Sequence, residues 1–276
     1  MIVVTGATGN VGRPLVHALL AAGEQVTAVS RRGSAPDGPA VGQPASFRHE
    51  RADLAEPESL KPALDGAEAL FLLLPGGIGA PVEVLELAKT AGVRRVVLLS
   101  SQGVGTRRHP PEAEDAVQRS GLEWTVLRPG GFASNSLLWA EAVRARRLVA
   151  APFGDVALPV VDPADIAEVA AVVLRSADHG GRTYELTGPV AISPRQQAAA
   201  IADVLGELVR FVEQSRAEAR EGLLGFMPEQ VADATLDVLG SPSPGEQLVS
   251  PDIERLLGRA PRTFAEWAAR NAAAFR

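Results

Sequence analysis

Residues Thr5-Gly6-Ala7-Thr8-Gly9-Asn10-Val11-Gly12 decide the fold of the first part of the chain. They follow the β-branched run Ile2–Thr5 and precede an amphipathic stretch at 11–22, so the predicted order is strand, turn, helix. In such a turn the first glycine permits a sharp exit, the second lets a phosphate approach the backbone, and the third lets the helix pack closely. The start of the helix adds N–H donors and a positive dipole end. The stretch therefore predicts a dinucleotide-binding turn, and the residues expected at the phosphates are Gly6, Ala7, Thr8, Gly9, Asn10 and Val11.

Two arginines follow the second predicted strand, residues 25–30. Arg31 and Arg32 lie about 20 residues beyond the glycines, where an acidic residue would bind the ribose 2′-hydroxyl of NAD. Guanidinium groups instead suit a 2′-phosphate, which favours NADP. We expect one of the pair to be a solvated loop charge, and Arg13 is a third candidate for the same phosphate.

Short apolar runs alternate with amphipathic stretches over the first 130 residues, which is typical of a parallel sheet covered by helices. The predicted strands are 2–5, 25–30, 69–74, 95–100 and 123–128, with a further run at 46–50. The predicted helices are 11–22, 57–64, 81–91 and 111–120. Right-handed crossovers then give an α/β fold with a Rossmann-type, doubly wound parallel sheet.

The regular alternation of predicted strands and helices ends after Gly130. We expect a helix at 134–146, a strand at 158–161, a helix beginning at Asp162, a strand at 183–187 and a helix opened by Ser193. Residues 213–221 read as a solvated helix face, 240–245 as a loop, and Thr263 as the start of a capping box for the last helix. The expected organisation is an NADP-binding Rossmann core at 1–130, joined again by segments near 150–190, and a small α+β, mainly substrate-capping region at 131–276.

Composition excludes several kinds of chemistry. The 276 residues carry a formal net charge of −6, so we expect no nucleic-acid partner. The chain has no cysteine, which excludes disulfides, thiolate metal sites and a thiol nucleophile, and no metal site is predicted. The first residues form no secretory signal and the apolar runs are too short to span a bilayer, so we expect a cytoplasmic protein without a membrane partner.

Four stretches together resemble the NmrA-like family of atypical short-chain dehydrogenase/reductases, and the resemblance covers nearly the whole chain. They are residues 4–12, Asp53-Leu54, residues 120–132 and residues 186–189. The resemblance implies a Rossmann domain with a C-terminal substrate-capping region that binds NADPH and, in some members, reduces quinones or other carbonyl compounds. It places Asp53 and Leu54 at the adenine, Leu73, Leu74 and Pro75 along the cofactor, and Pro129, Gly130 and Phe132 near the nicotinamide. For the side chains of Leu73 and Leu74, packing in the core is the favoured expectation, and their backbone could serve both purposes.

The tyrosine–lysine pair of ordinary short-chain dehydrogenases is absent. Tyr184 is the only tyrosine and no lysine lies four residues beyond it, so we expect it to pack with a bonded hydroxyl. The lysines, Lys61 and Lys89, do not fall near the end of a late strand. A reductase built on this chain needs another proton source or none.

Other polar residues are candidates for catalysis or positioning. Ser100, Ser101 and Gln102 end the 95–100 strand, where they either orient a carbonyl or ring oxygen or cap a turn; we assign Ser100 to the cofactor and Ser101 and Gln102 to catalysis. His109 is a candidate proton donor, against the alternative of an exposed loop residue. Glu114 is interpreted as a structural anchor of its helix.

An apolar pocket for a planar substrate is the last prediction. Phe132, Trp139 and Phe153 would line it, with Asn135 brought to the same helix face as Trp139 by its i, i+4 spacing. A place in the core is an equal alternative for Trp139. The favoured hypothesis is an NADPH-dependent oxidoreductase that passes hydride to a quinone or other conjugated carbonyl. The alternatives left open are a non-catalytic, NADP(H)-sensing regulator that binds a protein partner, and an isomerase or lyase for which no acid–base pair is evident.

Overall fold

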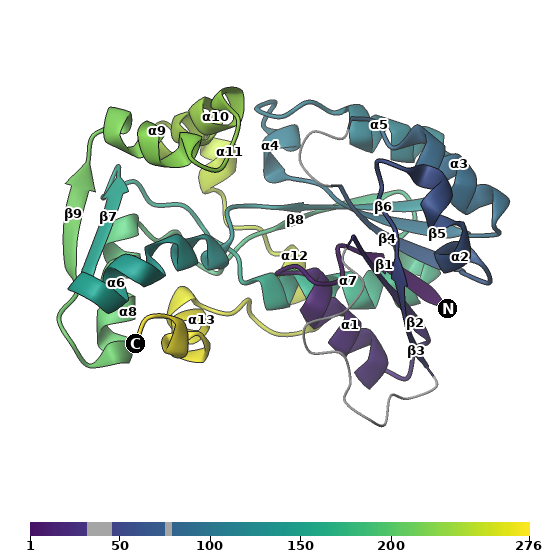
Figure 1. Cartoon of the computed structure of the whole chain (residues 1–276), viewed down its shortest axis with the longest axis horizontal. Coiled ribbons are helices and arrows are strands. Elements are labelled where there is room, and N and C mark those ends of the chain that lie inside the picture. The colour runs from purple at the N-terminus through teal and green to yellow at the C-terminus, as the bar shows by residue number, and fades with distance from the viewer. Residues whose placement is uncertain (32–45, 75–78) are drawn as a thin grey trace. The chain divides into compact units, whose positions relative to one another are not determined.

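Seven strands form one sheet in the order β3-β2-β1-β4-β5-β6-β8 (Figure 1). From β3 across to β6, each strand of the sheet pairs in parallel with its neighbours. The strands are β1 (Ile2–Thr5), β2 (Val26–Ser30), β3 (Phe47–Arg51), β4 (Ala69–Leu73), β5 (Arg95–Leu99), β6 (Glu123–Pro129) and β8 (Arg182–Leu186). The order reverses between β1 and β4, as in a Rossmann sheet. The predicted doubly wound α/β fold is therefore confirmed.

The structure is a computed structural model that describes residues 1–31, 46–74 and 79–276. These residues divide into two units. Unit 1 comprises Met1–Pro129, Pro163–Glu185 and Arg255–Leu257, and unit 2 comprises Gly130–Asp162, Leu186–Glu254 and Gly258–Arg276. Arg32 and Pro75, both predicted cofactor residues, lie outside the described residues.

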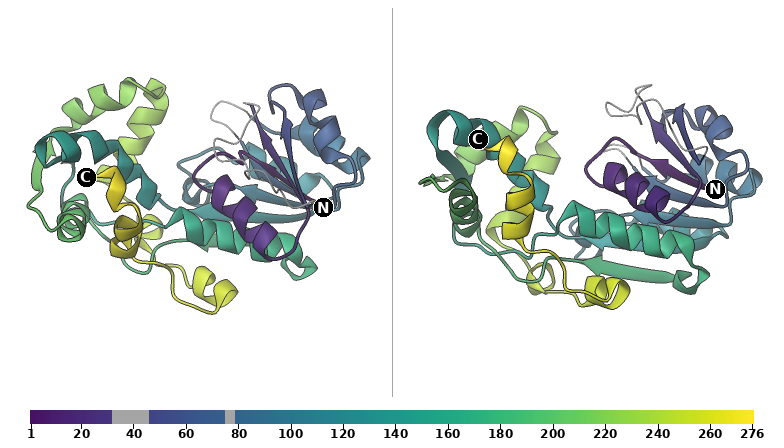
Figure 2. Two further views of the ribbon diagram at one scale, coloured as in Figure 1. Left: turned by 60° about the horizontal axis from the view of Figure 1, so that its bottom comes forward. Right: turned by 90° about the horizontal axis from the view of Figure 1, so that it is seen from below.

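Helices cover both faces of the sheet in unit 1 (Figure 2). On one face α1 (Gly12–Ala21) packs against α7 (Pro163–Arg175), which also contacts β4, β5 and β6. The remaining helices of this unit are η1 (Pro57–Leu60), α2 (Lys61–Leu64), α3 (Val82–Thr90), α4 (Gln102–Gly105), α5 (Glu112–Arg119) and η3 (Ala177–His179). Apolar residues of the strands, such as Leu70, Leu72, Val96 and Leu98, are buried against leucine and valine side chains of α2, α3 and α5. This burial supplies the main stabilisation of the sheet.

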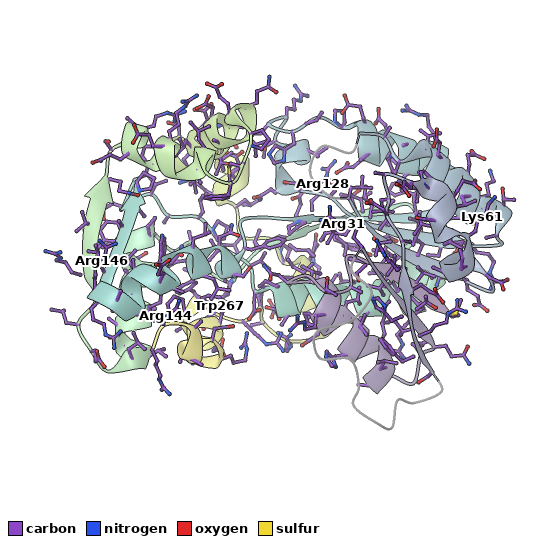
Figure 3. The ribbon with its side chains drawn as sticks, in the orientation of Figure 1. Arg31, Lys61, Arg128, Arg144, Arg146 and Trp267 are labelled. Atoms are coloured by element: carbon purple, nitrogen blue, oxygen red, sulfur yellow. The ribbon has the colours of Figure 1, made fainter. Side chains whose placement is uncertain are left out.

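Unit 2 contains the parallel strand pair β7 (Leu148–Pro152) and β9 (Arg210–Gln214). Its helices are η2 (Ala133–Trp139), α6 (Ala140–Arg146), α8 (Pro194–Leu205), α9 (Arg216–Leu224), α10 (Glu229–Gly240), α11 (Pro244–Gln247), α13 (Phe264–Arg270) and η4 (Ala272–Ala274). Helix α12 (Asp252–Leu257) has residues in both units. The core of unit 2 is built around Trp267 (Figure 3). Its ring contacts the rings of Phe264 and Phe275.

Three local predictions for this half were wrong in whole or in part. Residues 158–161 form only isolated bridges, Leu158 to Ile192 and Val161 to Phe132, because Pro159 between them has no N–H to donate. Residues 240–245 are not one loop, since α10 ends at Gly240 and Ser243 caps α11 with Glu246. Residues 213–221 include the end of β9 before α9 begins.

Candidate functional site

The turn after β1 is built on two glycines at which a side chain would strain the backbone. Gly6 has φ +63°, and a Cβ on Gly12 would lie 2.2 Å from the Gly6 carbonyl oxygen. The first turn of α1 therefore presses directly on the backbone of the strand exit. A side chain at Gly12 would separate the two.

Backbone amides of this turn are available to a ligand. Among the described residues, the N–H groups of Thr8, Val11 and Gly12 donate to no protein acceptor. The first turn of α1 carries no acidic side chain that would compete with an anion for the helix dipole. Open donors and an uncompensated positive helix end fit a pyrophosphate.

Thr5 fixes the turn against β4. Its hydroxyl donates to the Phe71 carbonyl at 3.0 Å and accepts from the Leu73 amide at 2.8 Å. A Cβ on Gly6 would meet the Leu73 side chain at 3.3 Å, so Leu73 packs on the turn itself. The contact lies where the strand order reverses, the place at which doubly wound sheets bind dinucleotides. Leu74, also predicted along the cofactor, is half-buried against the core of unit 1.

The end of β2 places Arg31 at the surface (Figure 3). The preceding residue, Ser30, lies with its hydroxyl 2.9 Å from His49 Nε2 on β3. Arg31 forms no ion pair with any of the residues that the structure describes, so its guanidinium is available to a 2′-phosphate. That role stays a prediction.

Asp53 and Leu54 follow β3 in a tightly bonded loop. The Asp53 carboxylate accepts from the Ala55 amide at 3.0 Å, and the Ser59 hydroxyl accepts from the Asp53 amide at 2.9 Å. Leu54 is buried in the core of unit 1. The loop is therefore held by its own hydrogen bonds, while its contact with adenine stays a prediction.

At the end of β5, Ser100 and Ser101 point to different partners. The Ser100 hydroxyl lies 2.5 Å from Glu114 Oε1. Ser101 caps α4 by accepting from the Gly103 amide at 3.1 Å, and His109 Nδ1 lies 3.1 Å from the same hydroxyl. The structure thus brings His109 and Ser101 together, with His109 exposed to solvent. Gln102 is buried at the first position of α4.

Glu114 and Arg128 form a paired group beside Ser100. Arg128 donates from Nε to Glu114 Oε1 at 2.9 Å and from Nη2 to Oε2 at 2.7 Å, and from Nη1 to Glu185 at 3.3 Å (Figure 3). The hydrogen bond to Glu114 is the main cause that raises the pKa of Arg128 above its ordinary value. The Glu114 side chain is 3% exposed, which confirms that it anchors its helix. Sequence reasoning missed Arg128 and Glu185, although an arginine in an apolar strand signals a carboxylate partner.

Tyr184 has no free phenol for catalysis. Its hydroxyl lies 2.8 Å from His179 Nδ1, and the two rings meet edge to face. The predicted packing role with a bonded hydroxyl is confirmed. Within the described residues, no group of three or more His, Cys, Asp or Glu is placed to hold a metal ion.

The residues predicted near the nicotinamide lie where the chain passes from unit 1 to unit 2. Pro129 ends β6 in unit 1, buried, whereas Gly130 and Phe132 belong to unit 2. Within unit 2 the Gly130 amide donates to the Leu186 carbonyl and Phe132 bridges to Val161.

The predicted pairing of Asn135 with Trp139 was wrong. The segment is a 3-10 helix, in which residues four apart do not share a face. Asn135 is exposed, whereas Trp139 packs partly on the core of unit 2. Phe153 is held with φ +53° and its ring occupies the space that Gly240 leaves.

Comparison with known proteins agrees with this geometry. Residues 6–177 match the family described as NAD(P)H-binding. The chain is 38% identical over 285 residues to the (4-alkanoyl-5-oxo-2,5-dihydrofuran-3-yl)methyl phosphate reductase of Streptomyces griseus, an alignment that covers 100% of this chain and 99% of that protein. It is 34% identical over 290 residues to the NAD(P)H azoreductase of Xenophilus azovorans, with 100% and 99% covered.

A solved structure is similar along the whole chain. The NADPH-dependent quinone oxidoreductase QOR2 of Escherichia coli, complexed with NADPH, superimposes with a TM-score of 0.80 and 28% identity, covering 98% of this chain and 99% of that one. No helix among the described residues is long and apolar enough to cross a membrane. From the match over residues 6–177 and the full-length relatives, the chain belongs to the NAD(P)H-binding family, in its NmrA-like group of atypical short-chain dehydrogenase/reductases.

Proposed function

We propose that this chain is an NADPH-dependent oxidoreductase that passes hydride to a quinone or other conjugated carbonyl compound. The observation that carries the proposal is the glycine turn with its open amides at the reversal of the sheet, in a chain whose full-length relatives are named as reductases. The amides of Thr8, Val11 and Gly12 would hold the diphosphate, and Arg31 would select the 2′-phosphate. NADPH supplies the hydride when it is bound.

A conjugated acceptor fits the polar residues that the site offers. Because Tyr184 is bonded to His179, it is not placed as the acid that reduction of a simple ketone needs. A reduced quinone spreads its negative charge over the ring and takes protons from solvent, so no tyrosine acid is required. Within this proposal His109 is the candidate proton donor for acceptors that need one, and Ser101 orients its ring. Gln102 supports the same short helix.

Unit 2 is the proposed source of the acceptor-binding surface. Its sequence begins directly after the strand that ends at Pro129, and Phe132 is the first candidate, while Gly130 stays a proposed nicotinamide contact. A regulator without turnover is not favoured, because the relatives that match over the whole chain are named for reduction. We also propose a cytoplasmic location, which fractionation of host cells would check.

Anaerobic oxidation of NADPH tests this function. The purified chain is mixed with NADPH and each of a panel of benzoquinones, naphthoquinones, butenolides, azo dyes and unconjugated ketones, and absorbance of the reduced nicotinamide is followed. We expect consumption equal to the acceptor reduced for the quinones or butenolides, and none for unconjugated ketones. Bound NADPH that stays unconsumed across the whole panel would exclude the proposed function.

A further inference from the structure

Ser100 has its hydroxyl proton committed to one partner. Its Oγ lies 2.5 Å from Glu114 Oε1, and both oxygens of that carboxylate also accept from Arg128. A carboxylate has acceptors only, so the proton between Ser100 and Glu114 belongs to the serine. The lone pairs of Ser100 Oγ are what remain for a ligand.

Arg128 holds Glu114 in a single orientation. The two parallel hydrogen bonds, at 2.9 and 2.7 Å, fix the plane of the carboxylate. A Cβ on Gly105 would lie 2.9 Å from Arg128 Nη1 and 3.0 Å from Glu185 Oε1, so the short helix α4 closes over the guanidinium. With Arg128 confined on that side and Glu114 3% exposed, the direction of the Ser100 O–H bond is set by the protein.

Ser100 lies in the half of the fold that is expected to bind the nicotinamide. In a Rossmann sheet the strands on the β4 side of the reversal form the second mononucleotide-binding half. Ser100 follows β5 in that half and is partly exposed, and its amide donates to Leu127 on β6. The nicotinamide ring carries a carboxamide whose N–H₂ group is a hydrogen-bond donor.

We propose that Glu114 and Arg128 are positioning residues that hold the Ser100 hydroxyl as an acceptor for the carboxamide N–H of nicotinamide. The inference rests on the cofactor of the proposed function and deepens it. It assigns the group that fixes the rotation of the nicotinamide ring. When the carboxamide N–H is bonded to this acceptor, the nicotinamide ring presents only one of its two faces to the substrate.

Equilibrium binding tests the proposal without any acceptor. The probes are NADP⁺ and its 3-acetylpyridine analogue, in which a methyl group replaces the carboxamide NH₂. We expect the wild-type chain to bind the analogue about five- to tenfold more weakly, the value of one hydrogen bond. Ser100→Ala should bring the ratio of the two dissociation constants close to one, and Ser100→Thr, which keeps the hydroxyl, should restore it.

The positioning pair is tested with a double variant. A change at Arg128 alone would leave the buried Glu114 carboxylate without its cation, so Arg128→Met is combined with Glu114→Gln. We expect this double variant to lose most of the discrimination while it still binds NADP⁺.

A matched control lies on the same two strands. Arg95 and Glu123 pair at 3.3 Å at the opposite end of β5 and β6. The double variant Arg95→Met with Glu123→Gln should keep the wild-type ratio. Thermal melting of both double variants shows that they are folded.

Each outcome of these binding experiments either supports or overturns the proposed role of Ser100, Glu114 and Arg128. A wild-type ratio near one, or an unchanged ratio in Ser100→Ala or in the Glu114/Arg128 variant, overturns the proposal. Failure to bind either nucleotide overturns it together with the proposed function. Normal discrimination without turnover of any acceptor upholds the positioning role and excludes only the proposed reaction.

Discussion

The amide of Leu73 donates to the hydroxyl of Thr5 at 2.8 Å, across the point where the order of the sheet reverses. The same hydroxyl donates to the Phe71 carbonyl, so one buried side chain ties β1 to β4 immediately before the glycine turn. The position of the turn is thus set by a hydrogen bond between strands that are distant in sequence. We therefore expect cofactor binding and local stability to depend on the same contact.

Thr5→Val should lower the stability of the protein and weaken NADPH binding. It leaves the Leu73 amide without its acceptor, so we expect the free energy of unfolding to fall by about 1–3 kcal/mol and the dissociation constant of NADPH to rise. Thr125→Val is the control, because Thr125 is equally buried and donates to the His179 carbonyl at 2.9 Å, away from the turn. Denaturant unfolding and NADPH fluorescence titration measure the two effects. Unchanged NADPH affinity in Thr5→Val would separate the contact from the site.

Gly12→Ala should abolish tight cofactor binding. The new Cβ would lie 2.2 Å from the Gly6 carbonyl oxygen, so the start of α1 must move away from the turn. We expect NADPH affinity to fall by more than about tenfold. Gly222→Ala in α9 is the control, since a Cβ there meets nothing within 4 Å and alanine favours a helix. Fluorescence titration of both variants tests this, and wild-type affinity in Gly12→Ala would contradict it.

Arg31→Gln should change the choice of coenzyme. Loss of the guanidinium removes a charge-assisted contact to the 2′-phosphate, so NADPH should bind about tenfold more weakly while NADH is little affected. Arg94→Gln is the control, because Arg94 pairs with Glu68 at the surface at 3.2 Å, before the start of β5. A parallel loss of affinity for both coenzymes in Arg31→Gln would show that Arg31 does not select the 2′-phosphate.

His109→Gln should slow the reduction of acceptors that need a proton from the protein and spare those that do not. Turnover of an enone should fall, because its reduced product must gain a proton at carbon or oxygen, whereas turnover of a quinone should be retained. His17→Gln, on the exposed face of α1, controls for loss of an imidazole elsewhere. Steady-state rates with the two acceptor classes give the answer. Equal losses with both classes would exclude a proton-donor role.

The ion pairs between α9 and α10 predict a pH-dependent stability. Arg220 donates to Asp233 at 2.6 Å and lowers the pKa of Asp233 below its ordinary value of 3.8. A lowered folded-state pKa stabilises the fold above the unfolded-state pKa, and this stabilisation is lost as the pH falls through the folded-state value.

Arg220→Gln should therefore lower Tm by about 1–3 °C at pH 7, and the difference should be smaller at about pH 2, where more of Asp233 is protonated. Arg146→Gln is the control, because Arg146 forms no ion pair with any described residue (Figure 3). Circular dichroism melting at both pH values measures the gap. A Tm difference that is larger at the acidic pH would contradict a stabilising ion pair between Arg220 and Asp233.

The first half of the chain was predictable because its signals are local. Glycines at fixed spacing and buried apolar runs such as Ala69–Leu73 specify turn, strand and helix within a few residues. Unit 2 was harder, since β9 is mostly exposed and polar and its partner β7 follows a helix without a glycine or proline stop. Strand β9 has no apolar run beyond two residues, and β7, although apolar, contains only one β-branched residue.

Side-chain pairings at the site were the least predictable. The contact between Ser100 and Glu114 joins residues 14 positions apart, and that between Arg128 and Glu185 joins residues 57 apart. Such contacts depend on which strands lie next to each other. The sequence indicated a structural role for Glu114 without naming its partner, and the arrangement of β5, β6 and β8 supplies it.

Calorimetric titration of the purified chain with NADPH and with NADH tests the central claim most directly. The account predicts one site per chain, with NADPH bound at least about tenfold more tightly than NADH. Tighter binding of NADH, or no heat with either coenzyme, would contradict it.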